Sequence, residues 1–251
     1  MYLYLILNLA SISIPFAYSF HRKMNFIKYW KTIFSSILIV GLAFILWDAI
    51  FTLDGVWGFN TKYHLPYKLL GLPIEEWLFF ICIPYASVFI HYALDYYYPK
   101  AELSKKLTYT ITLLIITILA ITIIFHSDKA YTLVNFSLAI IIFCIGLIKI
   151  KYLQKFYLSF LIILIPFFIV NGILTGSFID EPIVWYNDNE NLRIRIVTIP
   201  VEDIVYAFNL LFLNILFIEK LKYKRKKISF SSNKNITTHF VWALALINFL
   251  V

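Results

Sequence analysis

Long apolar segments alternate with short polar connections along the whole chain. Eight of these segments approach the roughly 20 apolar residues that an α-helix needs to cross the hydrocarbon layer of a bilayer. They cover approximately residues 1–20, 32–50, 73–94, 107–125, 131–149, 156–175, 200–218 and 236–251, and the last is the shortest. Glycine and proline are sparse, with 7 and 8 residues, which favours long helices over strands of alternating polarity. The pattern therefore predicts an all-α, polytopic transmembrane helical bundle with seven or eight spans.

Composition agrees with a membrane protein. Of the 251 residues, 61% are hydrophobic and only 14% are charged, which is more apolar surface than a soluble domain can bury. The first apolar segment lacks the basic start of a secretory signal, so we expect it to stay as a helix. The two cysteines, Cys82 and Cys144, lie in apolar segments and form no disulfide framework or zinc motif. The isolated histidines show no metal spacing, so no metal site is expected.

The placement of basic residues predicts the topology. The connections after the first, third, fifth and seventh segments hold 17 of the 22 Lys and Arg residues, and the other connections hold 5. By the positive-inside rule the first set is cytoplasmic, and both termini lie outside if all eight segments span. The net charge of +8 is therefore explained by topology, and no nucleic-acid partner is expected. We expect a multi-pass protein of the cytoplasmic membrane.

A short acidic motif occurs twice. Residues 73–79 read PIEEWLF and residues 200–206 read PVEDIVY, and each motif opens a long apolar segment. Upstream of them, residues 47–52 (WDAIFT) match residues 170–175 (VNGILT). The second loop between these matches is four residues longer than the first. The chain is therefore expected to contain a duplicated unit of helix end, aromatic-rich outer loop and acidic helix start.

The number of intervening spans predicts how the two copies are oriented. Four predicted spans separate the motifs, and an even number gives both copies the same orientation in the membrane. This is a parallel repeat of about four helices each, with residues 1–125 as the first unit and 126–251 as the second. Both acidic pairs then lie on the same side of the membrane, where they can face one shared cavity.

The acidic pairs are the candidate chemistry of the chain. Proline at the first helical position and acidic residues in the first turn also favour helix formation, so one copy alone would be ordinary. Ionisable residues at the edge of a hydrocarbon layer are costly, and their duplication indicates a function. A buried carboxyl group retains its proton, and aromatic faces stabilise a cation, a combination that suits protonation of an alkene. The candidate catalytic residues are Glu75, Glu76, Glu202 and Asp203.

These motifs resemble those of the heterodimer-type lycopene cyclases of carotenoid-producing bacteria and archaea, in the form that fuses both halves on one chain. The resemblance covers nearly all of the sequence. It rests on residues 72–80 (LPIEEWLFF), 55–60 (GVWGFN), 171–176 (NGILTG), 184–187 (VWYN) and 199–203 (IPVED). It implies an integral membrane isomerase that closes the ends of linear lycopene into β-ionone rings by way of γ-carotene, without a cofactor. The acidic residues of the family's motif carry over to the four carboxylates named above.

Further residues are candidates for binding the substrate. We expect Glu75 and Glu202 to be the proton donors, because Phe79 and Tyr206 lie one helical turn after them. Arg193 and Arg195 are candidates to pair with Glu202 or Asp203 and tune its proton affinity. The candidate substrate-binding residues are Phe79, Tyr206, Trp57, Trp185, Tyr186, Asp48, Asn171 and Arg193. The tryptophans and Tyr186 are equally typical of membrane-interface anchors.

Other functions stay open at this point. A proton-coupled carrier can also have a parallel helical repeat, although carriers usually place their charges near the midplane. A cyclase of C50 carotenoids and a non-catalytic assembly subunit are further alternatives. The expected partners are a lipophilic carotenoid substrate and membrane lipid, and a homo-oligomer or contacts with other carotenoid enzymes stay open.

Overall fold

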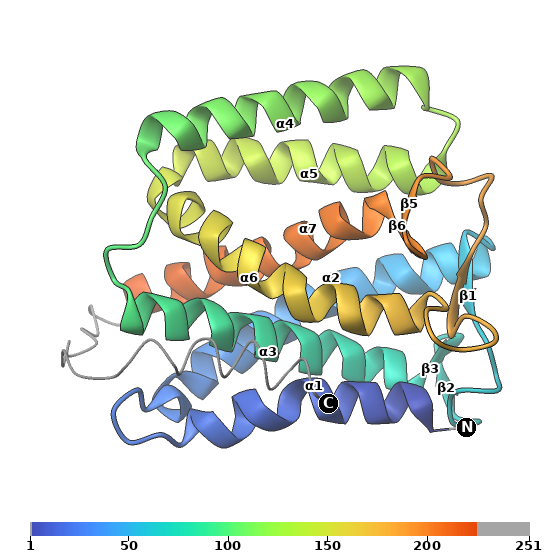
Figure 1. Ribbon diagram of the computed structural model, residues 1–251, viewed down its shortest axis with the longest axis horizontal. Helices are drawn as coiled ribbons and strands as arrows, with labels where there is room; N and C mark the ends of the chain where they lie inside the picture. The colour runs from blue at the N-terminus through green and yellow to red at the C-terminus, as the bar shows by residue number, and fades with distance from the viewer. Residues whose placement is uncertain (1, 225–251) are drawn as a thin grey trace.

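The computed structural model describes residues 2–224, which form seven α-helices side by side with short strands at one end (Figure 1). The helices are α1 (Leu3–Ser19), α2 (Trp30–Leu53), α3 (Ile74–Tyr97), α4 (Lys105–Phe125), α5 (Ala130–Ile148), α6 (Ile150–Leu174) and α7 (Val201–Lys224). A 3-10 helix, η1 (Phe26–Tyr29), precedes α2. The strands are β1 (Trp57–Phe59), β2 (Lys68–Leu69), β3 (Leu72–Pro73), β4 (Val184–Tyr186), β5 (Arg195–Ile196) and β6 (Ile199–Pro200).

The helices have the length and polarity of membrane spans. Within the described part of the chain, α2 to α7 are each long and apolar enough to cross a bilayer, and α1 is a shorter apolar helix of 17 residues. The outer surface of α4 exposes leucine, isoleucine and phenylalanine, as lipid contact requires. The predicted all-α membrane bundle is therefore confirmed. The predicted eighth span, residues 236–251, lies outside the described residues.

Both acidic motifs lie at the same end of the bundle. Helices α3 and α7 begin beside the strands, at the end of the bundle where α1 also begins (Figure 1). The basic connections between α1 and α2, α3 and α4, and α5 and α6 gather at the opposite end. The chain therefore has the alternation that the distribution of Lys and Arg predicts.

Helices α1–α3 and α5–α7 form two equivalent units. The Asn8 side-chain amide on α1 donates to the Glu75 backbone carbonyl over 2.8 Å, and that of Asn135 on α5 donates to the Glu202 carbonyl over 2.7 Å. Both pairs are related by the same shift in sequence, 127 residues, as the two acidic motifs. Helix α4 links the two units. A fourth helix in each repeat, and the division at residue 125, stay predictions.

The outer loops meet in an antiparallel strand pair between the two units. Strand β1 pairs with β4 so that Gly58 lies opposite Trp185 at the centre of the pair. A Cβ atom at Gly58 would lie 2.3 Å from the Trp185 ring, so any other residue there would displace this ring. The strand register makes Gly58 the counterpart of Trp185. This pair has the same 127-residue shift as the acidic motifs, so the four extra residues of the second loop precede β4.

Each acidic helix is entered through a tight hairpin. Strands β2 and β3 are joined by Leu70 and Gly71, whose φ angles of 54° and 80° are both positive. This is the backbone that a two-residue hairpin requires. In the second unit, Val197 has a φ of 59° in the turn between β5 and β6. The hairpins end on the motif prolines and thereby set how the first turns of α3 and α7 face the bundle.

Candidate active site

A large cavity begins at the acidic end of the bundle, between α1, α3, α6 and α7. Together with the space at its mouth, it contains about 1370 Å³ not occupied by protein atoms. Along α3 its wall runs from Glu76 to Ile90, which at 1.5 Å per residue is about 21 Å. The remaining wall is mostly apolar and aromatic. The cavity therefore suits a long apolar ligand with one end at the carboxylates.

Glu76 and Asp203 are the motif carboxylates that line this cavity. They are only 6% and 5% exposed. The hydroxyl of Tyr4 on α1 donates a hydrogen bond to Glu76 Oε2. In the second unit, the hydroxyl of Tyr131 on α5 donates to Asp203 Oδ1 over 2.7 Å. The two units therefore present one carboxylate each, held by equivalent tyrosines, at the end of one cavity.

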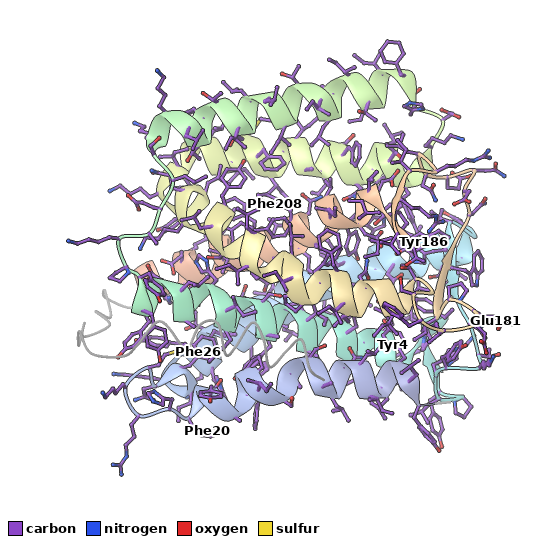
Figure 2. The ribbon with its side chains drawn as sticks, viewed as in Figure 1. Tyr4, Phe20, Phe26, Glu181, Tyr186 and Phe208 are labelled. Carbon is purple, nitrogen blue, oxygen red and sulfur yellow. The ribbon has the colours of Figure 1, made fainter. Side chains whose placement is uncertain are left out.

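Asp203 has two further donors. Asn171 Nδ2 on α6 donates to Asp203 Oδ2 over 2.8 Å, and the Tyr186 hydroxyl on β4 donates to the same oxygen over 2.9 Å. Burial, together with the nearby Asp203, holds the pKa of Tyr186 well above its usual range. Tyr186 therefore keeps its proton and remains a donor at any physiological pH. Figure 2 shows Tyr186 and Tyr4 at the strand-bearing end of the bundle.

Glu76 has a different neighbour in the position equivalent to Asn171. This neighbour is Asp48, near the end of α2, which also lines the cavity and is 3% exposed. Its Oδ1 accepts a hydrogen bond of 2.5 Å from Trp57 Nε1. Its other oxygen, Oδ2, is buried without a hydrogen-bond partner among the described residues. The first unit therefore brings two carboxyl groups together where the second unit has one carboxyl group and an amide.

Glu75 and Glu202 do not line the cavity, although both are fully buried. Glu75 Oε1 accepts a hydrogen bond of 2.7 Å from the backbone N–H of Leu65. Glu202 Oε1 accepts equivalent bonds of 2.8 Å from the N–H of Leu192 and from the hydroxyl of Thr132. These carboxylates fasten the outer loops to the helix starts. The geometry does not favour the sequence-based choice of Glu75 and Glu202 as proton donors.

The structure brings together most of the predicted substrate-binding residues and separates two of them. Those that line the cavity are Asp48, Trp57, Phe79, Asn171, Tyr186 and Tyr206. Trp185 lies outside, 43% exposed and against Gly58. The Arg193 side chain donates to the Asp188 carbonyl over 2.8 Å and to Asn189. It does not reach the cavity.

The predicted pairing of Arg193 or Arg195 with a motif carboxylate was wrong. The Arg195 guanidinium instead forms an ion pair of 2.6 Å with Asp188 in the same loop. The hydrogen bond and the charge of Arg195 hold the pKa of Asp188 below its usual value. Both arginines therefore stabilise the second outer loop.

Sequence reasoning missed the tyrosines and asparagines of α1 and α5. Tyr4 and Tyr131 donate to the cavity carboxylates, and Asn8 and Asn135 donate to the first turns of α3 and α7. A signal was present, because both pairs share the 127-residue spacing of the acidic motifs.

Comparisons with known proteins identify the family. The family model for lycopene cyclase matches residues 1–94 and 128–221, which are the two equivalent units without α4. No curated protein and no solved structure matches the chain. Since the match covers well over half of the sequence and includes both acidic motifs, the chain belongs to the lycopene cyclase family.

Proposed function

We propose that this protein is a lycopene β-cyclase that converts the linear ends of lycopene into β-ionone rings by acid–base catalysis. The observation that carries the proposal is the position of Glu76 and Asp203. Both are buried at one end of a long apolar cavity, and both are held there by tyrosine hydroxyls. A general acid and a general base beside an apolar chain are what a redox-neutral cyclisation of an alkene requires.

The neighbours of the two carboxylates suggest their roles. Two neighbouring buried carboxyl groups resist joint ionisation, so we assign the transferable proton to the Asp48–Glu76 pair, whose members both line the cavity. Asp203 accepts hydrogen bonds from Tyr131, Tyr186 and Asn171, and donors of this kind stabilise a carboxylate. We therefore assign Glu76 as the proton donor and Asp203 as the base.

The reaction then follows from ordinary carbocation chemistry. The terminal double bond of lycopene takes the proton from Glu76, and its electron pair becomes the new C–H bond, which leaves a tertiary cation. The next double bond in the six-membered arrangement attacks this cation and closes the ring. Asp203 removes a ring proton, and the electrons of that C–H bond form the double bond of the β-ring. The net change is an isomerisation, and the enzyme regains its starting state when the proton returns from Asp203 to Glu76.

Aromatic side chains around the carboxylates suit the cationic intermediate. Trp57, Phe79 and Tyr206 line the cavity beside Glu76 and Asp203. The negative face of an aromatic ring attracts a cation without forming a bond to it. The rings also exclude water, which would otherwise trap the cation as an alcohol. Their arrangement supports cyclisation over hydration.

The proposal is tested by pigment analysis. The chain is expressed in a bacterium engineered to accumulate lycopene, and the extracted carotenoids are separated by chromatography. We expect γ-carotene and β-carotene to replace lycopene. Unchanged lycopene with the protein present in the membrane would contradict the proposal. The same experiment with C50 precursors and with an ε-ring standard identifies the substrate length and the ring type.

A further inference from the structure

Because the two units are equivalent, each contains a related path between its helices to the carboxylates. One path lies between α1, α3 and α6 and is the cavity described above. We name it the open slot, with Ser11, Ala86 and Val170 as its defining residues. The related path lies between α5, α7 and α2. We name it the closed slot. Adding 127 to a residue number on α1 or α3 gives its counterpart on α5 or α7, and subtracting 123 from a residue number on α6 gives its counterpart on α2.

Small side chains in the open slot have large counterparts in the closed slot. Ser11 on α1 and Ala86 on α3 line the cavity. Their counterparts, Leu138 on α5 and Leu213 on α7, pack against a buried hydrophobic cluster that includes Phe44. Each leucine side chain is much larger than that of its counterpart in the open slot. The open slot therefore has small side chains at two positions where the closed slot has leucines packed against a buried cluster.

The third difference lies beside the acids. Val170 on α6 lines the open slot, one residue before Asn171. Its counterpart is Trp47, one residue before Asp48. The centre of the Trp47 ring lies 5.0 Å from that of the Tyr206 ring. The Phe44 ring packs edge-on against the Tyr206 ring, with 5.1 Å between the ring centres. Tyr206 is the counterpart of Phe79. In the closed slot the rings of Trp47 and Tyr206 therefore pack together, whereas the equivalent Val170 and Phe79 line the cavity of the open slot.

We propose that lycopene enters only through the open slot, and that Ser11, Ala86 and Val170 control its access to both carboxylates. This inference rests on the proposed cyclase function and deepens it. Ala86 lies ten residues after Glu76 on α3, about 15 Å along the helix. A polyene with its end at Glu76 must therefore pass Ala86. Trp47, Leu138 and Leu213 exclude the polyene from the equivalent path, so one chain end at a time reaches the acids.

Matched substitutions test the proposal. Ala86→Leu and Val170→Trp copy the closed slot into the open slot, and Ala86→Val is a smaller step. Leu138→Ser and Leu213→Ala copy the open slot into the closed slot. We expect the first two to lower lycopene conversion at least tenfold at equal amounts of membrane protein, with Ala86→Val between them and the unmodified chain. Leu138→Ser and Leu213→Ala are expected to convert lycopene within twofold of the unmodified chain.

The outcomes separate the inference from the proposed function. An unmodified chain that leaves lycopene unchanged contradicts the cyclase itself. If the unmodified chain converts lycopene and Ala86→Leu and Ala86→Val do so at the same rate, the slot assignment is wrong. Equal losses from Leu213→Ala and Ala86→Leu would mean that the loss does not depend on filling the open slot, which also overturns the slot assignment. Thermal unfolding in detergent shows that the compared variants are folded, and Ala86→Val keeps the comparison valid if the larger substitutions are not.

Discussion

Glu76 and Asp203 occupy equivalent positions in the two units, yet their neighbours differ. The difference comes from one position on the second helix of each unit, Asp48 in the first and Asn171 in the second. In the proposed mechanism the neighbouring carboxyl group of Asp48 helps Glu76 to keep a proton, whereas the amide donor of Asn171 stabilises the carboxylate of Asp203. A nearly symmetric scaffold can in this way hold one acid and one base.

The assignment of the proton donor predicts unequal effects within the first motif. Glu76→Gln removes the transferable proton, so we expect lycopene conversion to fall about 100-fold or more, the usual range for loss of a general acid. Glu75→Gln keeps an oxygen that accepts from the Leu65 N–H, so conversion should fall less than tenfold. Pigment analysis at matched expression measures both. The reverse order would return the role to Glu75.

The Asp48 neighbour gives a second prediction at this scale. Asp48→Asn keeps the shape of the side chain but removes the carboxyl group that shares a proton with Glu76. We expect at least a tenfold loss of cyclisation, with a fall in rate at a lower pH than in the unmodified chain, because Glu76 alone loses its proton more easily. The activity of membranes from pH 5 to 9 measures this. An unchanged pH profile would contradict a shared proton.

The residues at the site were partly predictable from sequence. Duplication identified the four motif carboxylates, and the match of Asp48 with Asn171 identified their neighbours. The sequence did not show which member of each pair faces the cavity. Adjacent residues in a helix point about 100° apart, and the hairpin that enters the helix decides which of them turns inward. The choice of Glu75 and Glu202 rested on aromatic spacing and ignored that rotation.

At the scale of elements, the first and third helices of each unit are tied by one buried asparagine. Asn8 and Asn135 both donate to a backbone carbonyl in the first turn of the acidic helix. Asn135 also accepts from Asn209 on α7 over 2.9 Å. These bonds fix α3 and α7 against α1 and α5 without using the carboxylates.

These asparagines predict a loss of stability. Asn135→Ala leaves Asn209 with fewer partners in a buried site, where an unpaired polar group costs about 1–3 kcal/mol. We expect a lower unfolding temperature in detergent. Asn8→Ala should have the same sign and a smaller effect, because Asn8 lacks a counterpart of the Asn209 bond in the described contacts. Ser13→Ala is the control, since its hydroxyl bonds within α1 at an exposed position. A stability unchanged by Asn135→Ala would contradict this role.

The elements themselves were largely predictable. The apolar segments located α2 to α7 because a membrane span needs a length and a polarity that few other structures have. The strands were not predicted, since two or three residues carry no periodicity. The pairing of β1 with β4 depends on Gly58 meeting Trp185, a contact between distant residues.

At the scale of the whole molecule, the parallel repeat places both acidic helix starts at one end of the bundle (Figure 1). The cavity extends about 21 Å from Glu76 along α3, and the hydrocarbon layer is about 30 Å thick. Linear lycopene is about as long as that layer. When one end of the substrate lies at the carboxylates, the other end is therefore far from any of the motif acids.

This geometry predicts two separate turnovers for each molecule of β-carotene. After the first ring closes, γ-carotene must leave or reverse before its linear end reaches Glu76 and Asp203. We expect γ-carotene to accumulate before β-carotene when membranes containing the protein receive labelled lycopene. Added unlabelled γ-carotene should then dilute the label in β-carotene, because the released intermediate mixes with it. Labelled β-carotene that forms without detectable γ-carotene and without dilution would show that both ends react during one binding event. That result would require a second reaction centre at the opposite end of the substrate, where the described structure has no equivalent of the two motifs.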